Sequence, residues 1–198
     1  MSFRTMRLLP RLAATALAIF LAVLTSGAMA ADAPTPAPAT KPAPAKPVQD
    51  PHVGSSSGLP LPRFVSLRAD AVNLRVGPGD QYPILWVYHR VGLPVEVLRE
   101  FDVWRLVVDS EGTKGWMHEA TLMGGRHFVI NGTAPVTLYR RATTDADPRA
   151  QLMPGVVGAI ERCDAGSDWC RVRVDHVAGW LQRSEFWGSL PGEKIPAK

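Results

Sequence analysis

The 198-residue chain has little net charge once its first block is set aside. It contains 22 Lys and Arg against 18 Asp and Glu, but Arg4, Arg7 and Arg11 lie in residues 1–30, which hold no acidic residue. The rest therefore carries almost equal numbers of basic and acidic side chains. Nucleic-acid-binding domains usually show a basic stripe, and no basic run here is longer than the dipeptide at 140–141. The composition argues against a nucleic-acid partner.

Cysteine and histidine are also scarce, which limits the chemistry that the chain can perform. A Cys/His mechanism needs a thiolate beside a base, and two cysteines with one nearby histidine fall short of the four ligands of a structural zinc site. No histidine stands in a motif with a nucleophile. We therefore expect no enzymatic activity, no metal and no cofactor. The residues concerned are Cys163, Cys170, His52, His89, His118, His127 and His176.

No apolar run is long enough for a stable membrane span. The longest, Leu12–Leu24, follows the three arginines and precedes the A-x-A pattern at 28–30, an order typical of a secretory signal peptide. We expect residues 1–30 to be a signal peptide that is removed after Ala30, leaving no membrane span. An uncleaved anchor is the alternative.

Residues 31–62 form a second block with its own composition. They hold nine of the 18 prolines, mostly alternating with Ala or Lys, and end with the Gly54–Gly58 run of glycine and serine. Such a sequence cannot build a core and favours extended polyproline II conformations. It predicts a disordered Pro/Ala-rich linker, which is either a tether that holds the folded part off the membrane or reaches into the cell wall, or a solvated leader with no partner.

The third block lacks any helical period and reads as all-β. Short runs rich in β-branched and aromatic residues alternate with dense glycine-containing turns, which is typical of small barrels or a sandwich. The predicted strands are Ile84–Val91, Val95–Phe101, Trp104–Val108, Val156–Cys163, Trp169–Val174 and Val177–Gln182.

This block also repeats itself at an offset of 63–65 residues. The matched landmarks are Leu74 with Leu138, Gly92 with Gly155, Val97 with Ile160, Trp104 with Trp169, and Gly115-Trp116 with Gly179-Trp180. The repeat predicts two domains at 63–124 and 125–188, followed by a C-terminal tail at 189–198. Modules of about sixty residues bury little core alone, so we expect the two to pack together. Gly115 is expected to permit a close approach between strands.

The motifs of the first copy resemble bacterial SH3-like (SH3b) domains of the exported tandem type found in Gram-negative bacteria. They are Val72-Asn73-Leu74-Arg75, Gly77-Pro78-Gly79, Tyr82-Pro83, Trp104 and Gly115-Trp116. The second copy resembles the same type through Trp169, Gly179-Trp180 and Trp187-Gly188. The resemblance implies two tandem, partly open SH3-like barrels and a non-enzymatic binding role in the periplasm.

Cys163 and Cys170 span a predicted hairpin of the second copy. An even number of cysteines in an exported chain indicates a disulfide. We expect these two to form one intramolecular bond.

The candidate ligand site lies in the first copy, between the Gly77–Tyr82 loop and the Glu100–Trp104 turn. Aromatic side chains there supply flat anchors and acidic ones can meet a cationic group. The second copy lacks the Gly-Pro-Gly turn, so we expect it to bind weakly and act as support. The candidate residues are Arg75, Asp80, Tyr82, Trp86, Asp102 and Trp104, with Glu96 and Glu100 at the rim.

Two functions remain open at this point. The leading one is a cell-envelope binding or adaptor protein whose partner is a peptidoglycan peptide or an envelope protein. The other is a structural or self-association module without a small ligand. Exposed tryptophans beside acidic groups favour the first, and burial of the same tryptophans between the barrels favours the second.

The signal-peptide pattern gives the first testable prediction. N-terminal sequencing of the protein recovered from the exported fraction should begin at Ala31. Recovery of the chain only as a full-length, membrane-bound form would contradict it.

Overall fold

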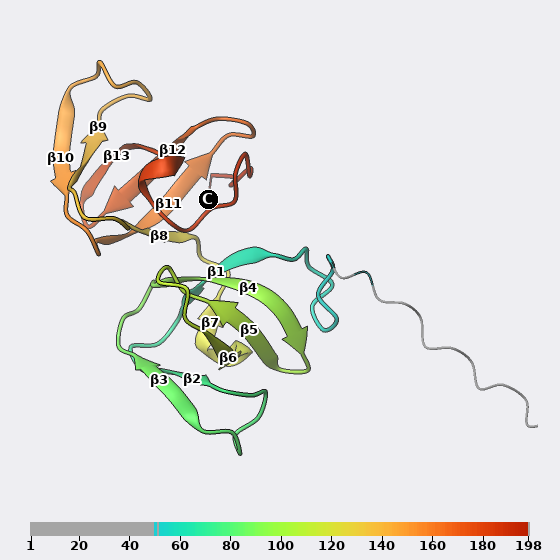
Figure 1. The fold of residues 1–198 in the computed structure, drawn as a ribbon. Coiled ribbons are helices and arrows are strands. Elements are labelled where there is room, and N and C mark those ends of the chain that lie inside the picture. The colour runs from blue at the N-terminus through green and yellow to red at the C-terminus, as the bar shows by residue number, and fades with distance from the viewer. Residues whose placement is uncertain (1–49, 51, 198) are drawn as a thin grey trace, which may run out of the picture. The chain divides into compact units, whose positions relative to one another are not determined.

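The structure is a computed structural model that describes residue 50 and residues 52–197. It shows two curled antiparallel sheets in tandem (Figure 1). The signal peptide and most of the predicted linker lie outside the described residues. Within the described part, no helix is long and apolar enough to cross a membrane.

Barrel 1 is a seven-stranded sheet in the order β3-β2-β6-β5-β4-β1-β7. It consists of the β2–β3 hairpin, the β4–β5–β6 meander and the strands β1 and β7, with a short 3-10 turn, η1, before β7. Its core includes Leu67, Leu74, Val97 and Met117, all fully buried. The strands are β1 (Arg63–Leu67), β2 (Val72–Arg75), β3 (Ile84–Tyr88), β4 (Pro94–Phe101), β5 (Trp104–Val108), β6 (Lys114–His118) and β7 (Leu122–Met123), and η1 is Glu119–Thr121.

Barrel 2 repeats this arrangement in the order β10-β9-β13-β12-β11-β8. The core again lies inside the curled sheet, around Phe128, Leu138, Val172 and Leu181. The repeat and the all-β prediction are confirmed. The strands are β8 (His127–Val129), β9 (Val136–Tyr139), β10 (Pro148–Leu152), β11 (Val157–Cys163), β12 (Trp169–Val174) and β13 (Val177–Gln182), followed by η2 (Arg183–Glu185).

One glycine in each barrel joins the hairpin to the meander. A Cβ on Gly115 would lie 2.6 Å from Cγ of Leu74 and 2.8 Å from the carbonyl oxygen of Arg75. The equivalent Gly179 would meet Leu138 at 2.5 Å. Only a residue without a side chain admits this approach, so the role expected for Gly115 is confirmed.

The two cysteines form the expected disulfide. Cys163 ends β11 and lies opposite Cys170 in β12, with their Cα atoms 4.4 Å apart. Both are fully buried in the core of barrel 2. The bond therefore closes the β11–β12 hairpin.

Contacts between the barrels involve both aromatic and polar side chains. The ring of Phe64 packs edge-on against Trp187, with centroids 4.7 Å apart. Nδ1 of His127 lies 2.9 Å from Oγ of Ser66, and Arg90 donates to the carbonyl oxygen of Gly155 at 2.7 Å. The expected packing of one module on the other is present.

A strap formed by residues 52–60, which the sequence places in the linker, folds onto barrel 1. The backbone N–H groups of Ser56 and Ser57 donate to Oε2 of Glu100 at 3.0 and 2.8 Å. The Ser57 hydroxyl and the Arg63 guanidinium donate to Oε1 at 2.7 and 2.6 Å. The side chain of Glu100 has no exposed surface, so it is buried under the strap and does not stand at a groove rim.

The C-terminal segment is likewise packed on its barrel. Ile195 is buried and exchanges two backbone hydrogen bonds of 2.9 Å with Cys163. The guanidinium of Arg183 donates to four backbone carbonyl oxygens, those of Asp164, Ser167, Leu190 and Glu193. The predicted tail thus contributes to the core of barrel 2.

The contacts of Glu100 with the strap and Arg63 make the free energy of unfolding depend on pH. Burial alone would raise the pKa of Glu100, but hydrogen bonds from Ser57, Arg63 and Ser56 outweigh it and lower the pKa from 4.5 to about 2. Because the folded-state pKa is depressed, the stabilisation is present above pH 4.5 and is lost as the pH falls toward 2. By linkage it amounts to about 3 kcal/mol.

We therefore expect Glu100→Gln to destabilise the protein by about 3 kcal/mol at pH 7 and by progressively less as the pH falls through this window. Urea unfolding at a series of pH values measures the difference. Glu111→Gln, at an exposed glutamate for which the described residues show no ion pair, is the control and should change little. A Glu100→Gln effect that stays constant between pH 7 and pH 2.5 would contradict this origin.

Candidate functional site

Barrel 1 carries a hollow of about 200 Å³ where the β2–β3 loop faces the end of the meander. We call it the Arg75 hollow. Three of the six predicted site residues line it, and they come from β2, the loop and β5. Its lining residues are Ala71, Asn73, Arg75, Asp80, Trp104, His118 and Thr121.

Arg75, the last residue of β2, holds the following loop in place. Its guanidinium donates to the carbonyl oxygens of Asp80 at 3.0 Å and Tyr82 at 2.7 Å. The carboxylate of Asp80 lies 3.3 Å from the same guanidinium but is 84% exposed. Surface pairs of this kind contribute little stability, so Asp80 is free to meet a cationic group.

Trp104 and His118 form the aromatic part of the hollow. They lie opposite each other on β5 and β6, and their rings contact edge-on with centroids 5.2 Å apart. Nδ1 of His118 accepts from the backbone N–H of Ala120 at 3.1 Å, which fixes the ring at the start of η1. Trp104 is only 7% exposed. The hollow thus has a rigid, largely buried indole as one wall.

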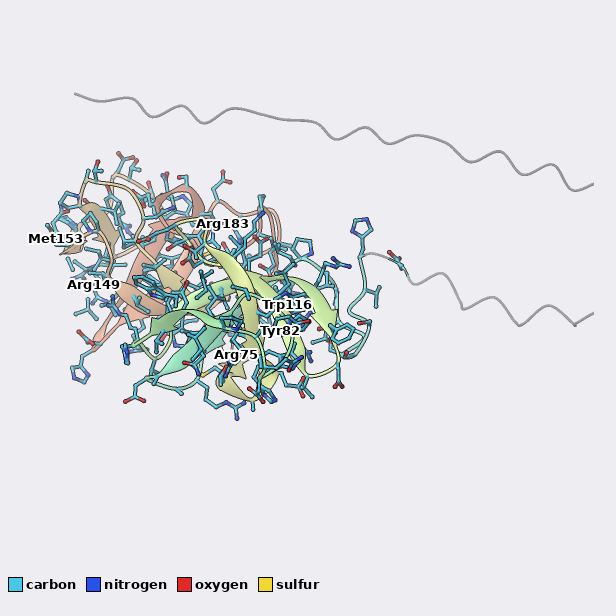
Figure 2. The ribbon with its side chains drawn as sticks, turned by 60° about the horizontal axis from the view of Figure 1, so that its bottom comes forward. Arg75, Tyr82, Trp116, Arg149, Met153 and Arg183 are labelled. Carbon is cyan, nitrogen blue, oxygen red and sulfur yellow. A yellow bond between two sulfur atoms is a disulfide. The ribbon has the colours of Figure 1, made fainter. Side chains whose placement is uncertain are left out.

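Tyr82 and Asp102 do not line this hollow. The ring of Tyr82 lies against Gly77, and the residue is 39% exposed. The backbone carbonyl oxygen of Tyr82 accepts a hydrogen bond from Arg75. Figure 2 shows Arg75, Tyr82 and Trp116 gathered in one region of barrel 1. Asp102 is exposed in the β4–β5 turn, where its φ of 50° is left-handed.

Trp86 lies elsewhere. It lines a second hollow of about 500 Å³, the Trp86 hollow, together with Leu85, Leu93 and, from barrel 2, Val129 and Gly155. Its side chain is 61% exposed. The six predicted residues are therefore divided: Arg75, Asp80 and Trp104 line one hollow, Trp86 lines another, and Tyr82 and Asp102 line neither.

Two polar side chains of the Trp86 hollow, Tyr88 and Asp109, are paired with each other. The Tyr88 hydroxyl donates to Oδ2 of Asp109 at 2.7 Å, and burial together with this hydrogen bond raises the pKa of Tyr88. Oδ1 of Asp109 accepts from the backbone N–H groups of Glu111 and Thr113. These contacts hold the β5–β6 turn and leave an apolar surface above it.

Barrel 2 fills the equivalent of the Arg75 hollow differently. Tyr139 pairs with Trp180 as Arg75 pairs with Trp116, so Tyr139 takes the place of the arginine. Its ring contacts Trp169 edge-on, with centroids 5.8 Å apart. Two rings in contact thus stand where barrel 1 has the cation that holds its loop.

Sequence reasoning did not select His118, Asn73 or Thr121 as site residues. Asn73 lies within the recognised motif, and His118 directly follows the Gly-Trp strand, opposite Trp104. Pairing β5 with β6 from the predicted hairpin would have identified the histidine. Thr121 sits in η1, for which the sequence carries no strong signal.

In the part of the chain that the structure describes, no group of three or more His, Cys, Asp or Glu side chains could hold a metal ion.

The fold and the hollow define a tandem small-barrel protein, and comparison with known families identifies it further. The family model described as "Bacterial SH3 domain" matches residues 68–124 and 132–188, more than half of the chain, so the protein belongs to the bacterial SH3 domain family. Domains of this family are generally non-catalytic modules that bind peptides or proteins.

A solved structure described as "Structure of NlpC1 from Trichomonas vaginalis" is similar over 72% of this chain and 51% of its own, with 10% identity and a TM-score of 0.31. The chain thus spans about half the length of that protein, and a likeness of this size carries no argument about function. Comparison with curated proteins found no match.

Proposed function

We propose that the protein is an exported, non-enzymatic binding or adaptor module of the cell envelope. Barrel 1 takes the ligand in the Arg75 hollow, and barrel 2 supports it. The ligand is an extended peptide with a cationic group, either a peptidoglycan stem peptide or a segment of an envelope protein.

The Arg75 hollow is the observation that supports this proposal most. Loops on a rigid scaffold commonly carry binding residues, and here Arg75 fixes the loop while Asp80 leaves its charge exposed. Trp104 offers a flat apolar wall next to that charge. A peptide amine and an adjacent apolar group fit this combination.

The proposed location in the periplasm rests on the sequence. The order of basic residues, apolar run and A-x-A pattern favours export. A disulfide in barrel 2 is in keeping with an oxidising compartment.

The difference between the barrels gives a testable prediction. Tyr82→Ala should weaken binding to purified sacculi or to an envelope partner by about 1–3 kcal/mol, because it removes an exposed aromatic anchor at the rim of the Arg75 hollow. Trp169→Ala removes an aromatic side chain from barrel 2 and should weaken binding little. Pull-downs with sacculi and with envelope extract, run side by side, measure both.

Circular dichroism must show that each variant is folded. Equal losses for the two variants, or unchanged binding by a folded Tyr82→Ala protein, would reject the site. Failure of the wild-type protein to bind either sacculi or an envelope component would reject the proposed function itself.

A further inference from the structure

The strand β3 combines a free edge with apolar side chains that water can reach. It is the terminal strand of its sheet and pairs only with β2. No other backbone or side-chain group in the described chain bonds to the backbone of residues 84–88. Ile84, Leu85, Trp86 and Val87 are 47, 50, 61 and 37% exposed. Edge strands of this kind are templates for pairing with another strand.

Both faces of β3 are apolar. A bulge at Leu85 places Ile84 opposite Arg75 and Trp86 opposite Leu74, and Leu85 and Trp86 both line the Trp86 hollow. Val87, opposite Asn73, lies on the outer face. A strand that pairs along this edge must therefore offer apolar side chains on both of its own faces.

The counterpart in barrel 2 shows how an edge is protected. β10 begins with Pro148, and its exposed residues are Arg149 and Gln151, which bond to Ala178 and Thr137. Proline and charge are common means of blocking an edge strand. In contrast, residues 81–88 contain no charged side chain.

We propose that β3 pairs antiparallel with β3 of a second copy of this chain, joining two barrel 1 sheets into one. The strand β3 of a second copy meets the requirements of this edge. It has free N–H and C=O groups along its own edge and apolar residues on both of its faces. Antiparallel pairing of a strand with itself has two-fold symmetry, as is usual for protein dimers.

Pairing centred on the middle residue uses the whole strand. Trp86 then lies opposite Trp86 of the other copy, and Ile84 lies opposite Tyr88. The paired strands also cover the exposed indole, which has no role in the Arg75 hollow.

The first test is the mass of the full chain in solution, purified as the cell processes it, by sedimentation over a range of micromolar concentrations. We expect a monomer–dimer equilibrium. Leu85→Lys combined with Val87→Lys should raise the dimer dissociation constant at least about tenfold. The control adds two lysines at the barrel 2 edge, Gln151→Lys with Met153→Lys, both at exposed positions, and should leave the equilibrium unchanged.

The second test uses introduced cysteines, since both native ones are in the disulfide. Trp86→Cys should form an intermolecular disulfide on mild oxidation. Ile84→Cys should not, because the two introduced thiols would be about four residues, or 13 Å, apart along the strands.

A wild-type chain that is monomeric at every concentration, or a dimer that withstands the β3 lysines, would overturn the proposal. Crosslinking of Ile84→Cys but not of Trp86→Cys would also overturn it. None of these outcomes bears on ligand binding in the Arg75 hollow, so failure here and failure of the proposed function are distinguishable.

Discussion

Each barrel depends on the close packing of its hairpin against a glycine of its meander. In barrel 1 the leucine of β2, Leu74, occupies the space above Gly115 and is fully buried, and Arg75 follows it directly. The strands β2 and β6 pair through Arg75 and Trp116. The position of Arg75, and with it the wall of the Arg75 hollow, therefore follows from the space that Gly115 leaves open.

The same junction supports different surfaces in the two copies. Barrel 2 keeps the glycine and the leucine but has Tyr139 where barrel 1 has Arg75. Tyr139 packs on Trp169. Arg75 instead donates to carbonyl oxygens of the loop, and this leaves the acidic side chain of that loop exposed. The disulfide and the packed C-terminal segment further stiffen barrel 2. One fold thus gives a candidate binding module and a support.

The predicted strands of the two meanders match the structure closely, because alternating β-formers and glycine turns are local signals. The strap could not be predicted in this way, since the partner of Ser57 is Glu100, 43 residues further along the chain. Arg75, Asp80 and Trp104 line one hollow because the end of β2 and the loop after it pack against the meander, where Arg75 pairs with Trp116. Trp86 and Tyr88 alternate along β3 and share one face of it, but both line the Trp86 hollow. The sequence pattern gives the strand face and does not give the neighbour that this face meets.

Substitution of the junction glycine tests this account most directly. Gly115→Ala and Gly179→Ala each place a methyl group within 2.6 Å of a leucine and beside a carbonyl oxygen, so each should lower the free energy of unfolding by about 1–3 kcal/mol in urea titrations. Gly124→Ala, at a glycine with open space around its Cα, should change it by less than about 0.5 kcal/mol. Equal stability of all three variants and the wild-type protein would contradict the dependence of the barrels on this contact.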